Sequence, residues 1–123
     1  MRALVIDDSA VTRGIIKHIL KAMAFEVFEA ADGREGLARV KELTPIDLVL
    51  VDWNMPEMDG IEFLQALRAE AVYVALPVVM VSTNSNAENI ATSLKAGANE
   101  YIMKPFTEEI IRNKLELLGF FQA

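Results

Sequence analysis

Apolar residues in this chain fall into five short runs that are rich in β-branched side chains. The runs lack strict alternation with polar residues, a pattern typical of parallel strands that are covered on both faces. They comprise Ala3–Ile6, Phe25–Phe28, Asp47–Val51, Val78–Val81 and Tyr101–Met103. The pattern therefore predicts five strands in the interior of the protein.

The segments that follow the first three runs have the spacing of helices. In the first segment, apolar residues recur at steps of three and four. We expect them on one inward face: Val11, Ile15, Ile16, Ile19, Leu20 and Met23. Residues 34–43 form the second predicted helix, with Leu37, Val40 and Leu43 facing inward. The third predicted helix carries Ile61, Phe63, Leu64 and Leu67.

Two further helices carry clear end signals. The fourth covers Asn86–Ala96 and is followed by Gly97, the residue type expected just past a helix end. The fifth begins after Thr107, an N-cap candidate, and opens with Glu108 and Glu109, whose charges suit the positive end of the helix dipole. Strands and helices that alternate in this way predict a parallel sheet with helices on both faces and right-handed crossovers.

Composition narrows the class of protein. The chain has 123 residues, 53% of them hydrophobic, and shows no linker or repeat, so we expect one domain over residues 1–123. A net charge of −6 without a basic stripe argues against nucleic-acid binding. The absence of cysteine excludes disulfides and thiolate metal sites. No apolar segment reaches the roughly 18 residues that span a membrane, and no signal peptide is apparent, so we expect a cytoplasmic protein without membrane contact.

Polar side chains follow four of the predicted strands. Asp7 and Asp8 follow the first strand, Asp52 the third, Ser82 the fourth and Lys104 the fifth. Parallel strands in such a sheet end at one edge, where ligands bind near the point at which the strand order reverses. We therefore expect these groups on one rim. If the first and third strands are neighbours, the three carboxylates converge.

Converging carboxylates repel one another and cannot all stay ionised without a cation or raised pKa values. Mg²⁺ is the simplest remedy, because it prefers oxygen ligands and uses one or two carboxylates together with a phosphate. His18 is the only histidine, which disfavours a zinc or copper site. With Lys104 as a cation and Ser82 as a hydroxyl donor, the set predicts phosphoryl transfer in which a carboxylate carries the group covalently.

Each of these residues has an ordinary structural explanation when it is taken alone. An aspartate at a strand end is most often a helix N-cap or a turn former, and a single serine or lysine there indicates nothing. It is their joint placement at four strand ends that favours a functional site.

Four segments in this order and spacing resemble the receiver domain of bacterial two-component response regulators. They are VIDDS, VDWNMPEMDG, PVVMVS and KAGANEYIMKPF, and the resemblance covers nearly the entire chain. Among members of that family, the chain is most similar to the free-standing chemotaxis regulators. The resemblance implies a flavodoxin-like three-layer α/β sandwich with strand order 2-1-3-4-5, no attached output domain, and a signalling module rather than an enzyme.

The resemblance also assigns roles to the rim residues. Asp52 corresponds to the phosphoacceptor, which attacks a phosphoryl group held on a histidine of a sensor kinase, here of the CheA-like type. Asp8 and Asp52 are the implied Mg²⁺ ligands, together with the backbone carbonyl of Asn54, and Asp7 acts through water. Lys104 pairs with the phosphoryl oxygens and Ser82 donates to one of them. The Lys104–Pro105 peptide matches a position that is commonly cis.

A switch face is implied at the fourth helix, the fifth strand and the fifth helix. Phosphorylation draws Ser82 inward and leaves room for Tyr101 to turn from an exposed to a buried rotamer. Ile90, Tyr101 and Lys114 match positions on that face, whose expected partner is a flagellar motor switch protein or another effector. Without the family match, Tyr101 reads as a partly buried aromatic of an edge strand.

Some positions depart from the family pattern, and others lie where the residue type sets a rate in the family. Thr83 stands where the family usually has alanine or glycine, so we expect it to narrow access to the acceptor and to slow phosphoryl exchange. Asn54 and Asn84 lie where the family sets the rate of phosphate loss. The stretch Asn86–Ala87 replaces the lysines that chemotaxis members often carry at the start of the fourth helix, which weakens the case for a flagellar-motor target.

Other functions stay open at this point. The domain could serve a phosphorelay outside chemotaxis or act as a phosphate sink. A Mg²⁺-dependent phosphatase of the haloacid dehalogenase type also uses an aspartate nucleophile, but it needs a second aspartate two residues later, where this chain has Asn54. An interaction module that no longer accepts phosphate is disfavoured, because competent residues fill every site position.

Overall fold

The protein is described by a computed structural model over residues 1–84 and 86–120. Within that range, one parallel sheet has the order β2-β1-β3-β4-β5, as predicted. Its strands are β1 (Arg2–Ile6), β2 (Glu26–Ala30), β3 (Leu48–Asp52), β4 (Val78–Ser82) and β5 (Glu100–Met103). The helices are α1 (Ala10–Ala22), α2 (Gly33–Leu43), α3 (Gly60–Arg68), α4 (Ala87–Ala96), α5 (Glu108–Leu117) and the short 3-10 helix η1 (Ala71–Tyr73).

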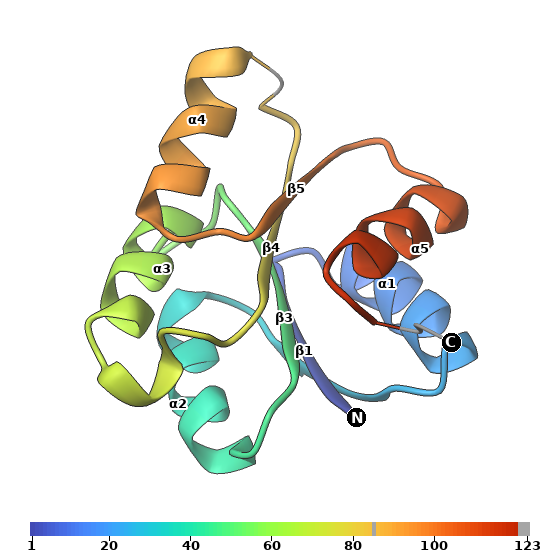
Figure 1. Ribbon diagram of the computed structural model, residues 1–123, viewed down its shortest axis with the longest axis horizontal. Coiled ribbons are helices and arrows are strands. Elements are labelled where there is room, and N and C mark those ends of the chain that lie inside the picture. Colours follow the sequence, from blue (N-terminus) through green and yellow to red (C-terminus); the bar gives the residue numbers. More distant parts are fainter. Residues whose placement is uncertain (85, 121–123) are drawn as a thin grey trace.

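Helices cover both faces of the sheet and so make three layers. In Figure 1, α1 and α5 lie on one side of the strands, and α2, α3 and α4 lie on the other. Alternate residues of a strand enter different cores: Leu4 and Ile6 of β1 pack with α2 and α3, whereas Ala3 and Val5 pack with α1 and α5. This two-sided burial is the reason that the strands read as continuous apolar runs.

Two helix ends form at the predicted signals, and a third differs by one residue. Asn86, predicted as the first residue of the fourth helix, is instead the N-cap of α4 and accepts a hydrogen bond from the Asn89 amide. Gly97 ends that helix in the left-handed region with φ of 118°. Thr107 caps α5 by accepting from the Ile110 amide. These local interactions fix where each helix meets the loops at the sheet edge.

One part of the predicted core is wrong. Val11 and Ile15 were expected on the inward face of α1, but they are 75% and 51% exposed. The buried stripe of that helix is formed by Ile16, Ile19, Leu20 and Met23. At 3.6 residues per turn, Ile15 and Val11 lie about 90° and 130° from the centre of this stripe. The prediction from steps of three and four therefore assigned residues of two different helix faces to a single face.

The strand boundaries differ from the predicted ones by one or two residues. Strand β2 begins after Phe25 and continues through Glu29 to Ala30, because its backbone pairs in register with β1 up to Ile6. Strand β3 begins after Asp47, whose carboxylate instead accepts from the Arg2 amide at 2.8 Å. The Lys104–Pro105 peptide is cis, as expected, and so is Thr44–Pro45, which was not predicted.

Candidate functional site

The sheet register brings the acidic residues together at the carboxyl edge. Ile6 of β1 lies opposite Val51 of β3, so Asp7 emerges beside Asp52. Asp7, Asp8 and Asp52 each place a carboxylate oxygen within 4.8 Å of the others. Asp7 and Asp52 are 1% and 7% exposed, whereas Asp8 is exposed. The convergence predicted from strand ends is confirmed in geometry.

Asp7 is the most firmly held of the three acids. Its Oδ1 accepts from the Ser9 amide at 2.9 Å, and its Oδ2 accepts from Lys104 Nζ at 3.0 Å. Its own amide donates to the Ala30 carbonyl, and its carbonyl accepts from Arg13 Nη1. The Asp8 side chain, by contrast, makes no hydrogen bond or ion pair with any residue among 1–84 and 86–120.

Lys104 lies between the two buried carboxylates. Its Nζ is 3.0 Å from Asp7 Oδ2 and 3.3 Å from Asp52 Oδ1. Burial alone would lower the pKa of this amine, but its hydrogen bonds and its attraction to the two carboxylates outweigh burial and raise the pKa. Lys104 is therefore positively charged at the rim. Its backbone is held next to β4, because its amide donates to the Ser82 carbonyl at 2.8 Å.

The Asp52 carboxyl group is electrostatically strained. Burial and the nearby Asp7 charge raise its pKa, and the opposing attraction of Lys104 is not sufficient to cancel them. One ammonium thus faces a cluster of three carboxylates. The cluster offers only oxygen donors and an excess of negative charge, the combination that a hard divalent cation such as Mg²⁺ satisfies.

Ser82 is positioned at the end of β4 on the same rim. Its side chain is fully buried, and its Oγ accepts from the Asn84 amide at 3.1 Å, which leaves the hydroxyl proton available for donation. The Asn84 carbonyl in turn accepts from the Tyr101 hydroxyl at 2.5 Å. Tyr101 is buried in this structure and so occupies the inward position. Asn84 therefore connects the rim serine to the tyrosine.

The loop after β3 is shaped by the backbone around Gly60. The Gly60 amide donates to the Trp53 carbonyl at 2.8 Å, and a Cβ at position 60 would lie 2.5 Å from the Asp52 carbonyl oxygen. Asp59 and Glu62 complete a capping box that starts α3 at this point. The chain can therefore turn tightly beneath Asp52, with Trp53 half-buried and Asn54 exposed.

The remaining predicted positions lie near the rim or on the face formed by α4, β5 and α5. Thr83 is exposed next to Ser82. Ile90 is half-buried against the core, and Lys114 pairs with Glu100 at 3.0 Å. Their proposed roles in access and partner binding stay predictions.

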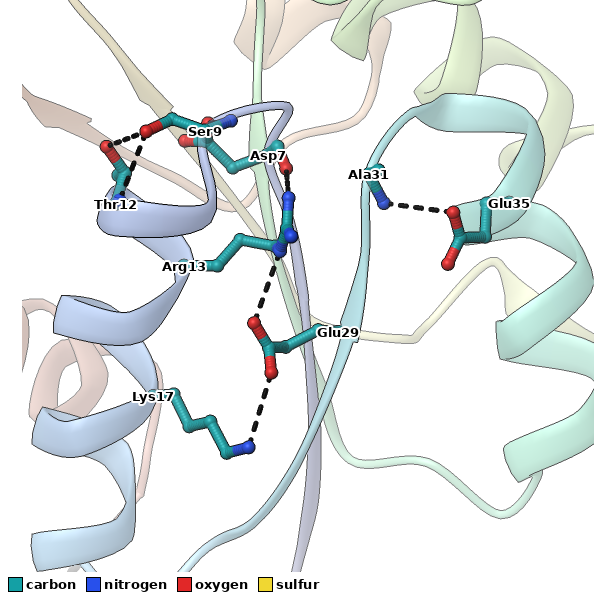
Figure 2. Close-up of polar contacts among 8 residues, drawn as sticks. All are labelled: Asp7, Ser9, Thr12, Arg13, Lys17, Glu29, Ala31 and Glu35. Atoms are coloured by element: carbon teal, nitrogen blue, oxygen red, sulfur yellow. Dashed lines mark hydrogen bonds and ion pairs between the residues drawn. The ribbon is translucent and has the colours of Figure 1, made fainter.

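Sequence reasoning missed the hydrogen bonds that hold Asp7 in place. The Ser9 amide donates to Asp7 Oδ1. Arg13 donates to the Asp7 carbonyl and is itself held by Glu29 (Figure 2). The only available signal was an arginine in the first turn of a helix that has no acid there.

Comparison with known proteins places these features in context. A family model described as the response regulator receiver domain matches residues 3–116. A chemotaxis protein CheY homolog of Campylobacter jejuni is 41% identical over 117 residues, covering 94% of this chain and 90% of the relative. CheY1 of Helicobacter pylori is 37% identical over 119 residues, covering 96% of each chain. The crystal structure of CheY4 of Vibrio cholerae superposes with a TM-score of 0.88 at 34% identity, covering 94% of this chain and 96% of that one.

Proposed function

The chain belongs to the response regulator receiver domain family, and from this premise we propose that it is a switch controlled by phosphorylation of Asp52. A sensor histidine kinase is the phosphoryl donor in this proposal. Mg²⁺ would be held by Asp8, by Asp52 and by the backbone carbonyl of Asn54, and Asp7 would act through water. The observation that carries the proposal is the buried Asp52 carboxylate, which lies within reach of two further acids and of Lys104.

The chain's own residues support an in-line displacement. An Asp52 oxygen attacks phosphorus, a new P–O bond forms, and the P–N bond of the donor phosphohistidine breaks with its electron pair going to the imidazole. Lys104 supplies positive charge next to the attacking oxygen, and the Ser82 hydroxyl can donate to the transferred group. The chemistry that bound Mg²⁺ would supply is neutralisation of negative charge on that group.

We further propose that the signal passes from the rim to the face formed by α4, β5 and α5. Asn84 binds Ser82 through its amide and Tyr101 through its carbonyl. A hydrogen bond donated by the Ser82 hydroxyl to the phosphoryl group would therefore shift the backbone at Asn84 and with it the contact to Tyr101. Because Tyr101 and Lys114 lie on or next to β5, a change in this loop alters the surface offered to a partner.

None of the helices among residues 1–84 and 86–120 is long and apolar enough to cross a bilayer.

A role in chemotaxis is the favoured biological setting, supported by the names of the relatives in Campylobacter and Helicobacter. The proposed partners are then a CheA-like kinase and a flagellar motor switch protein, and the setting is the cytoplasm. The alternative is a receiver in another phosphorelay or a phosphate sink. Phosphotransfer from a panel of the organism's histidine kinases would discriminate them, because a chemotaxis regulator is labelled fastest by the chemotaxis kinase.

The proposal is tested with acetyl phosphate as the donor. The expected result is a mass increase of one phosphoryl group in the presence of Mg²⁺, with loss of the label after treatment with hydroxylamine, as an acyl phosphate requires. Trp53 fluorescence should change in parallel, because the indole follows Asp52 directly in the chain. An unchanged mass with Mg²⁺ would rule the proposal out, and turnover of a generic phosphate ester would favour a phosphatase instead.

Lys104→Met should slow both the gain and the loss of the phosphoryl group by about 100-fold, because one preorganised charge at a reacting oxygen has this order of effect. Mg²⁺ affinity should hold or increase, since a competing cation has been removed 3.3 Å from Asp52. Stopped-flow Trp53 fluorescence measures both quantities. Lys41→Met, which removes a lysine paired with Glu70 on the surface, is the matched control and should leave the rates unchanged. Wild-type rates in Lys104→Met would contradict the role given to this ammonium.

A further inference from the structure

Arg13 makes contacts that its position in the helix does not explain. Its Nη1 donates to the Asp7 carbonyl at 2.6 Å, and its Nε donates to Glu29 Oε1 at 3.2 Å (Figure 2). The side chain is only 18% exposed. It therefore bridges the loop after β1 and the edge strand β2.

This placement has an electrostatic cost that its partners offset. A cation in the first turn of α1 opposes the positive end of the helix dipole, and this turn contains no acid. Glu29 compensates on β2, where it also accepts from Lys17 Nζ at 3.2 Å. Burial would raise the pKa of Glu29, but the bonds and charges of Lys17 and Arg13 outweigh it and lower the pKa. Glu29 thus stays ionised and holds the guanidinium against the Asp7 carbonyl.

The Asp7 carbonyl is a sensitive point of the site. It belongs to the planar peptide unit whose other end is the Asp8 amide, so its orientation determines the direction in which Asp8 leaves the loop. The Asp7 amide is already fixed on Ala30. Asp8 has no side-chain partner of its own among the described residues, so the peptide plane is the main restraint on its carboxylate.

We propose that Arg13, held by Glu29, is a positioning residue that orients the Asp7–Asp8 peptide for cation binding. The inference rests on the proposed function, because it assumes that Asp8 is a Mg²⁺ ligand. Arg13 acts here by geometry and not by charge. Lys17 carries the same charge on the same helix and pairs with the same glutamate, but among the described residues Glu29 is the only one with which Lys17 makes a side-chain hydrogen bond or ion pair.

The two effects of removing Arg13 have opposite signs. If only its charge matters, Arg13→Gln removes a repelling cation and Mg²⁺ binds as well as before or more tightly. If its bond to the Asp7 carbonyl matters, the peptide plane is freed and Mg²⁺ binds about 10-fold more weakly. This factor is the lower end of the loss in metal affinity that usually follows removal of a residue hydrogen-bonded to a metal ligand. Lys17→Gln makes the same change in charge and leaves the carbonyl bond in place, so it should bind Mg²⁺ within about twofold of wild type.

The test is calorimetric titration of Mg²⁺ into wild type, Arg13→Gln, Lys17→Gln and Arg13→Lys, with Trp53 fluorescence as a second readout. Arg13→Lys should recover part of the affinity, because an ammonium can donate to one of the two acceptors. Sucrose in every sample keeps the variants folded, and circular dichroism reports the folded fraction.

The outcomes separate this inference from the proposed function. A wild-type protein that binds no Mg²⁺ overturns both. If wild type binds Mg²⁺ and accepts phosphate while Arg13→Gln binds Mg²⁺ equally or more tightly, the positioning role alone is wrong. Equal weakening in Arg13→Gln and Lys17→Gln also overturns it, because Lys17 does not touch the carbonyl. Selective weakening in Arg13→Gln, with partial recovery in Arg13→Lys, supports it.

Discussion

Replacement of Asp52 with asparagine is expected to abolish phosphoryl acceptance and, at the same time, to stabilise the fold at neutral pH. Acceptance is lost because an amide oxygen is a poor nucleophile and forms no acyl phosphate. The second effect follows from the electrostatics of the site: burial and the Asp7 charge raise the pKa of Asp52, so its ionised form is disfavoured in the folded protein. A neutral isostere removes that penalty while Lys104 keeps its bond to Asp7.

The pH dependence has a definite sign. An acid with a higher pKa in the folded state than in the unfolded state holds more protons when folded, so stability falls as the pH rises from the unfolded value, about 3.9, through the folded one. Wild type and Asp52→Asn should therefore have similar free energies of unfolding at acidic pH. They should diverge as the pH increases, and the variant should be more stable by roughly 0.5–2 kcal/mol near pH 7.

Urea unfolding between pH 4 and pH 8 measures this difference, and mass spectrometry with acetyl phosphate measures acceptance. Added Mg²⁺ should stabilise wild type more than Asp52→Asn and so narrow the gap, because the ion favours the ionised site. Asp47→Asn is the matched control: this carboxylate accepts from the Arg2 amide at 2.8 Å, and its loss should not stabilise the protein. A variant that is labelled like wild type would exclude Asp52 as the acceptor.

The position of the site could be predicted from the sequence because one rule of topology governs it. Asp7, Asp52, Ser82 and Lys104 each lie at the end of a strand or directly after it, and parallel strands end at a common edge. No distance information was needed for that conclusion. The helix signals at Gly97 and Thr107 were equally local, and each residue caps its helix where it was predicted.

Interactions between distant segments could not be predicted in the same way. The bond from Arg13 to Glu29 joins residues 16 apart in the sequence and depends on how α1 lies against β2, which leaves no pattern in the chain. The outward position of Val11 and Ile15 depends on which helical stripe meets the sheet, and apolar spacing alone does not decide it. The sequence pattern therefore does not reveal which side chains hold Arg13 in place or which stripe of α1 packs against the sheet.

Arg68 makes a second set of unpredicted hydrogen bonds, at the edge of the sheet opposite the acidic rim, and Arg68→Met is expected to lower the free energy of unfolding by about 3–5 kcal/mol. All of its donors are used. Nη1 donates to the carbonyls of Tyr73 and Leu76, both at 2.7 Å. Nε and Nη2 donate to the Gly97 carbonyl, and Nη2 also donates to Asn99 Oδ1. One guanidinium thus connects the end of α3 to η1 and to the turn after α4.

The size of the effect follows from what methionine leaves behind. Replacing both members of a buried ion pair by apolar groups can be neutral, but here the partners are mostly backbone carbonyls that no substitution removes. The Arg68 side chain is half-buried, and this burial lowers the pKa of Arg68 from its ordinary value. Hydrogen bonds from a guanidinium that is partly withdrawn from water are stronger than those made in water. Asn99 Oδ1 also accepts from the Val78 amide, so the loss extends to the start of β4.

Urea denaturation measures the change, and a loss of this size lowers the melting temperature by roughly 10–20 °C in a domain of this length. Arg68→Lys keeps the charge but cannot supply five donors in a plane, so it should lose most of the same free energy. Arg112→Met, which removes an exposed partner of Glu108, should cost about 0.5 kcal/mol or less. A loss under about 1 kcal/mol in Arg68→Met would mean that water replaces the guanidinium at these carbonyls, and that the loops opposite the acidic rim hold their positions without it.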